Sequence, residues 1–179
     1  VKSVHNHETA HGLYTSRDFK GINAECKRLD IPFRDVNLFE DARIEALFRQ
    51  KRPTAVMKCC DIDHEGNFSV TSETYGVRKF GWLKWDTFAL DNPRNFLLSV
   101  IKCEGTKKHL DELEDFAKKS TLCAEFVSEK TKSIWGFDEF LKLWRKVAGR
   151  GADKRYPTTE SLLPLVKEFN DHFPLSPGE

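Results

Sequence analysis

The chain has 179 residues, 39% of them hydrophobic and 32% charged, which is typical of one globular domain with a charged surface. Its net charge of +1 excludes a uniformly basic polyanion-binding protein but allows local basic patches. Because no apolar run approaches the ~20 residues of a membrane helix, and the first residues do not form a signal peptide, we expect no membrane partner.

The N-terminal region is expected to hold a polar arm and then an amphipathic helix. Residues 1–12 are polar, and we interpret them as a flexible arm. Ser16 is a suitable N-cap, and the helix after it would end near Asp30. Its predicted buried stripe recurs at steps of three and four residues and consists of Phe19, Ile22, Cys26 and Leu29.

An extended segment, a second helix and a hairpin follow. Residues 31–36 begin with Ile-Pro-Phe and are predicted to be extended. A helix is predicted over 40–50. The almost continuously apolar run 54–62 predicts a central strand, and the turn residues after it predict a hairpin with 68–71.

This order of elements is similar to that of thioredoxin-like and glutaredoxin-type domains, but the chemistry differs. Where those proteins carry a cysteine pair, this chain reads Tyr14-Thr15-Ser16-Arg17-Asp18-Phe19, so a disulfide oxidoreductase is disfavoured. The five cysteines include no CxxC pair and lie within apolar patterns. We therefore expect reduced structural thiols and a cytoplasmic or nuclear location.

The rest of the chain is expected to contain a strand–helix–strand unit and two final helices. The unit is predicted over 95–103, 107–119 and 122–127. Apolar stripes then predict helices over 137–147 and around 162–173.

Together these elements predict an α/β (or α+β) fold. Its architecture would be a mixed sheet flanked by helices, with a helical C-terminal portion. We expect residues 1–179 to form a single domain with a frayed tail over 174–179.

A histidine motif in the first residues is one candidate site. His7-Glu8-Thr9-Ala10-His11 fits the pattern H-E-x-x-H. On a helix, His7 and His11 would share a face and could bind zinc, while Glu8 could activate a bound water. The segment resembles the zincin metalloproteases, which implies a third ligand, a Glu or His, further along the chain. However, Gly12 is a poor helix former and no sheet precedes the motif, so the flexible-arm interpretation is favoured.

Two aspartates at the end of the predicted central strand form another candidate. Asp61 and Asp63 lie where α/β folds place metal-binding or acid–base carboxylates, as in nucleases of the ribonuclease-H type. The segment 61–67 also resembles the first half of an EF-hand calcium loop, although its twelfth position is Ser72 instead of glutamate. A plain hairpin turn is favoured over both.

A basic, aromatic stretch over 75–85 is the most unusual local composition. Cations neutralise phosphates and exposed aromatic rings stack on bases, so this composition suits a single-stranded nucleic acid. The alternative is a strand with a buried aromatic face and cations at its rim. The candidate nucleic-acid-binding residues are Arg78, Lys79, Trp82, Lys84, Trp85, Arg150, Lys154 and Arg155.

The leading functional hypothesis is therefore a regulatory or processing domain that binds single-stranded RNA or DNA. Two alternatives stay open: a metal-dependent hydrolase that uses either candidate site above, and a protein-interaction module. The sequence does not decide whether the protein is an enzyme. No cofactor is predicted beyond a divalent metal in the hydrolase alternative.

Overall fold

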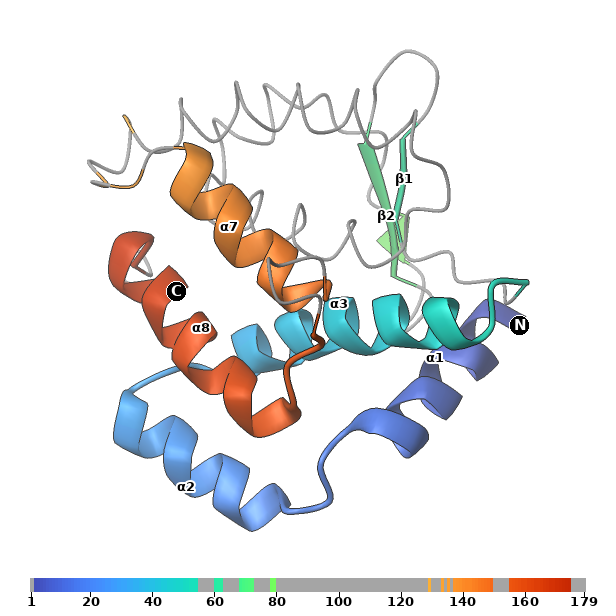
Figure 1. The fold of residues 1–179 in the computed structure, drawn as a ribbon, viewed down its shortest axis with the longest axis horizontal. Helices are drawn as coiled ribbons and strands as arrows, with labels where there is room; N and C mark the ends of the chain where they lie inside the picture. The colour runs from blue at the N-terminus through green and yellow to red at the C-terminus, as the bar shows by residue number, and fades with distance from the viewer. Residues whose placement is uncertain are drawn as a thin grey trace.

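The structure, a computed structural model, describes residues 2–54, 60–62, 68–72, 78–79, 129, 133, 135, 137–149 and 155–174. Most of these residues are helical (Figure 1). The helices are α1 (Lys2–Tyr14), α2 (Phe19–Leu29), α3 (Phe33–Lys51), α7 (Phe137–Val147) and α8 (Thr159–His172). The strands are β1 (Cys60–Ile62), β2 (Phe68–Ser72) and β3 (Arg78–Lys79). Among these helices, none has the length and apolar character needed to cross a bilayer.

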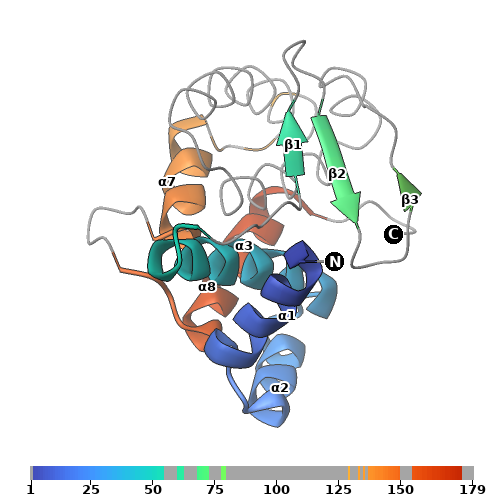
Figure 2. The same ribbon diagram turned by 90° about the vertical axis from the view of Figure 1, so that its right-hand side faces the viewer.

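The expected mixed sheet flanked by helices is wrong for the part of the chain that the structure describes, because that part is a helical assembly. The short strands pair in antiparallel fashion only, in the order β1–β2–β3, with Cys60 opposite Val70 as the predicted hairpin requires. They lie on the side of α3 away from α1 and α2 (Figure 2). Residues 2–51 contain no strand, so the thioredoxin-like order is absent as well.

Helix α3 occupies the centre of the described fold and is buried on nearly every side. It packs against α1, α7 and α8 (Figure 1). The helix begins at Phe33, directly after Pro32, so the extended segment predicted over 31–36 is wrong. Proline favours an extended conformation for the residue that precedes it, but the fixed φ of proline also suits the start of a helix. Here the helix starts directly after Pro32.

The two predicted C-terminal helices are confirmed as α7 and α8. Their apolar stripes face α3 and supply much of the main hydrophobic core. A capping box at Thr158 and Ser161 fixes the start of α8. The buried stripe residues are Phe140, Trp144, Val147, Leu162, Val166, Phe169 and Phe173.

Helix α2 is also present, but its N-cap and the exposure of its first residue differ from the prediction. Its N-cap is Asp18 and not Ser16, because the Asp18 carboxylate accepts a hydrogen bond from the Gly21 backbone N–H. Cys26 is buried as a free thiol, and this burial raises its pKa. Phe19, expected in the buried stripe, is instead 64% exposed.

The expectation of a flexible arm over residues 1–12 is wrong from Lys2 onward, because these residues form helix α1. The helix lies against α3 (Figure 2). A small apolar cluster joins the two helices and consists of Ala10, Tyr14, Ile44 and Phe48. The histidine motif is therefore held on a packed helix.

Candidate metal centre

Three potential metal ligands from two helices meet at one point. His7 and His11 are one turn apart on α1, and Asp41 faces them from α3. The His7 and His11 Nε2 atoms are 3.2 Å apart, and Asp41 Oδ1 lies 3.0 Å from His11 Nε2 and 3.6 Å from His7 Nε2. Asp41 is therefore a candidate third ligand, although the zincin-like motif implied a Glu or His in that place.

These distances fit a tetrahedral zinc ion. With zinc–ligand bonds of about 2.0–2.1 Å, two ligand atoms of a tetrahedral site lie roughly 3.3 Å apart. The distances of 3.0, 3.2 and 3.6 Å among the three atoms lie on both sides of that value. Two imidazoles and a carboxylate form a donor set that suits zinc better than magnesium or calcium. The three residues therefore fit the ion in both geometry and chemistry.

The second nitrogen of each imidazole is also engaged. His7 Nδ1 lies 2.7 Å from Oε1 of Glu45, a residue of α3. An ionised carboxylate can only accept, so His7 donates its Nδ1–H to Glu45, and its Nε2 is the ring atom that faces His11 and Asp41. His11 Nδ1 lies 3.0 Å from the Thr15 hydroxyl oxygen, which fixes the orientation of the second ring.

The cluster is buried on one side and open on the other. His7 and Asp41 are 3% and 1% exposed, whereas the His11 side chain is 23% exposed. His7 and His11 line a cleft of about 750 Å³, and so does Glu8, which is exposed. A tetrahedral ion on these three ligands would keep its fourth position for water or substrate.

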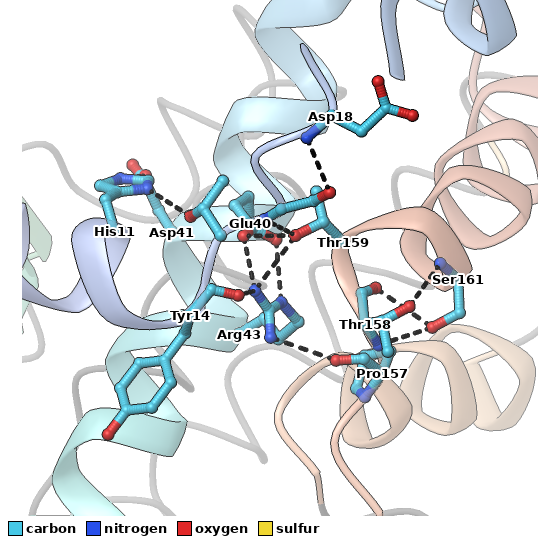
Figure 3. A network of polar contacts seen from close by, with 12 residues as sticks. His11, Tyr14, Asp18, Glu40, Asp41, Arg43, Pro157, Thr158, Thr159 and Ser161 are labelled. Carbon is cyan, nitrogen blue, oxygen red and sulfur yellow. Dashed lines mark hydrogen bonds and ion pairs between the residues drawn. The ribbon is translucent and has the colours of Figure 1, made fainter. Parts of the chain in front are cut away.

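A buried arginine fixes the helix that carries Asp41. Arg43 forms a two-point ion pair with Glu40, at 2.8 and 2.5 Å. It also donates to the backbone carbonyls of Tyr14 and Pro157, at 2.7 and 3.2 Å, as Figure 3 shows. Thr159 completes the network by donating to Glu40. Arg43 thus joins the end of α1, the middle of α3 and the start of α8.

Of the other predicted site residues, the ones that the structure describes lie in other elements. Asp61 lies in β1, while Asp63 lies outside the described residues. Arg78 and Lys79 form β3, and Arg155 is exposed just before α8. Trp82, Lys84, Trp85, Arg150 and Lys154 lie outside the described residues. Nucleic-acid binding through this set stays a prediction.

Comparison of the chain with protein-family models, with curated proteins and with solved structures gave no match. The function must therefore be argued from the chemistry of the centre itself.

Proposed function

We propose that the protein is a zinc-dependent hydrolase with His7, His11 and Asp41 as metal ligands and Glu8 as general base. The observation that carries the proposal is the triangle of ligand atoms, with sides of 3.0, 3.2 and 3.6 Å. Such a triangle forms only when α1 and α3 pack in a position that brings one side chain of α3 against two side chains of α1. Two of those side chains, His7 and Asp41, are almost completely buried, so packing fixes the positions of their ligand atoms.

The chemistry follows from the open side of the centre. A bound zinc ion with three protein ligands would lower the pKa of its water toward 7 and polarise a substrate carbonyl. Glu8 lies beside His7 in sequence and lines the same cleft, so its carboxylate can take the proton from the attacking water. It can then pass that proton to the leaving group.

Glu45 has a positioning role in this scheme. Its hydrogen bond to His7 Nδ1 sets the tautomer and orientation of the ring and increases the basicity of Nε2. Because the Glu45 side chain is fully buried, its carboxylate can hold the ring but cannot reach the cleft.

Zinc binding is the first test. Protein freed of metal with EDTA would be titrated with zinc by calorimetry, and we expect one ion per chain. His11→Ala should weaken binding by at least about a hundredfold, because a direct ligand matters more than a second-shell partner, which is worth 10- to 100-fold. His5→Ala is the matched control, because it removes an exposed imidazole from the same helix. Equal losses in the two variants, or no binding by the wild-type protein, would refute the zinc centre.

Hydrolysis is the second test. The zinc-loaded protein would be incubated with a mixed peptide library, and new termini would be read by mass spectrometry. Glu8→Gln should keep zinc affinity and lose cleavage, since it removes the base but no ligand. Cleavage that persists in this variant would exclude Glu8 as the base. Zinc binding without cleavage of any peptide would exclude a peptidase.

A further inference from the structure

The cleft at the metal centre has a pronounced apolar part. Besides the histidines and Glu8, its lining includes Phe19 and Ile22 from α2 and Phe33 and Val36 from α3. Ile22 and Val36 are 4% and 3% exposed and belong to the main hydrophobic core. The apolar part of the cleft is therefore supported by rigid, packed residues.

Two of its phenylalanines are exposed to an unusual degree. Phe19 is 64% exposed and Phe33 is 52% exposed. Each is the first residue of its helix, where the helix entry places it beside the cleft. Exposed aromatic rings that gather in a concave surface are typical of ligand-binding sites, because burying them against a ligand is favourable. By contrast, Leu13 has a similar exposure of 52% but lies outside the cleft.

The polar part of the lining indicates which apolar ligand fits. Thr15, Ser16 and Asn37 line the same cleft. A fatty-acyl chain has no group that can hydrogen-bond to them, whereas a hydroxyl such as that of Thr15, which already bonds His11, can take part in more than one hydrogen bond. A peptide combines apolar side chains with a backbone that donates and accepts hydrogen bonds, and it matches a lining of both kinds.

We propose, on the basis of the zinc hydrolase function above, that this cleft selects peptide substrates with an aromatic side chain next to the scissile bond. The aromatic ring lies against Phe19 and Phe33, above Ile22 and Val36. This placement brings the neighbouring carbonyl to the open side of the His7–His11–Asp41 centre. Aromatic rings pack favourably against one another in offset or edge-to-face geometry, which gives aromatic side chains an advantage over aliphatic ones.

The test uses small probes that bind zinc without being cleaved. Zinc-loaded protein would be titrated by calorimetry with N-acetyl-phenylalanine hydroxamate, N-acetyl-alanine hydroxamate and octanoyl hydroxamate. We expect the phenylalanine probe to bind at least about tenfold more tightly than the alanine probe, from the burial of its ring. Phe19→Ala should remove most of that preference. Leu13→Ala, an equally simple change at an exposed residue of α1, should leave it intact.

The outcomes separate this inference from the function on which it rests. Failure of the wild-type protein to bind zinc overturns both. Zinc binding with equal affinity for the phenylalanine and alanine probes overturns the aromatic selectivity alone. Tighter binding of the octanoyl probe replaces the peptide with an acyl substrate. An unchanged preference in both Phe19→Ala and Phe33→Ala places the recognition of the ring outside this cleft.

Discussion

Replacing Arg43 should cause one of the largest losses of stability available to a single substitution in the described part of the chain. Its side chain is 3% exposed and pairs with Glu40, which is 4% exposed. Arg43→Met leaves the Glu40 carboxylate buried with Thr159 as its remaining donor in this network, and it removes a donor from the carbonyls of Tyr14 and Pro157. Removing one partner of a buried ion pair costs about 3–5 kcal/mol.

That loss can be converted into a measurable shift. For a chain of 179 residues, 1 kcal/mol corresponds to a change in Tm of roughly 2–4 °C, so Arg43→Met should lower the Tm by about 6–20 °C. Urea unfolding followed by circular dichroism would give the free energy directly. Adding Glu40→Gln to Arg43→Met removes the buried negative charge and should restore more than about 1 kcal/mol.

The chain supplies a matched control for this experiment. Arg28 forms the same two-point pair with a glutamate three residues earlier, Glu25, but these side chains are 67% and 39% exposed. Arg28→Met should therefore cause no measurable loss of stability. The reasoning would be refuted by a loss below about 1 kcal/mol in Arg43→Met, or by equal losses in the two variants.

Four further predictions concern the proposed zinc centre and the carboxyl and thiol groups of Glu160 and Cys26. Removing zinc with EDTA should lower the Tm by roughly 5–10 °C relative to protein at a hundredfold excess over Kd, and calorimetric scans of His11→Ala should show no such shift. Glu45→Gln should weaken zinc binding 10- to 100-fold in calorimetric titrations while keeping one ion per chain. Cys26, whose pKa is raised by burial, should resist iodoacetamide in the folded chain and react in urea, as read by peptide mass spectrometry. The pKa of Glu160 is lowered, first of all by a hydrogen bond from the Ser16 hydroxyl. Its stabilising effect is present above the ordinary glutamate pKa and lost as the pH falls, so urea titrations of wild type and Glu160→Gln should converge below about pH 4.

The sequence predicted best the helices whose buried face is strongly apolar. In α7, Phe140, Trp144 and Val147 recur at helical spacing and are buried. Such a stripe indicates both a helix and the face of it that is buried. The burial of Cys26 could be predicted in the same way. The mixed sheet was overestimated because short apolar and proline-containing segments do not distinguish strand from helix, as the start of α3 demonstrates.

Helix α1 was missed for a specific physical reason. Its inward face is His7, Ala10, His11 and Tyr14, which follows the helical spacing i, i+3, i+4, i+7. Two of these four residues are histidines, so the stripe does not register as apolar. Gly12 is a poor helix former, but it lies near the end of α1, where a glycine costs little.

The third candidate ligand could not be identified from the sequence. Asp41 lies 30 residues after His11, and its approach depends on how α1 packs across α3. A usable signal was the spacing of Asp41 and Glu45, one turn apart on a predicted helix. Carboxylates at that spacing can serve two histidines that are also one turn apart. Glu40 and Arg43 obscured this pattern, because charged residues so close together on a helix usually mark a solvent-exposed face.

The attachment of α1 to α3 determines whether the cleft keeps one of its walls. One wall of the cleft belongs to α1, through His7, Glu8, His11 and Gly12, yet few apolar side chains fasten this helix to α3. The contacts of His7 with Glu45 and of His11 with Asp41 supply much of the remaining attachment. On the proposed zinc centre the ion adds a further link between the two helices, so a chelator would loosen α1 and with it this wall of the cleft. Proteolytic nicking within the first fourteen residues should then report metal occupancy as faithfully as any assay of turnover.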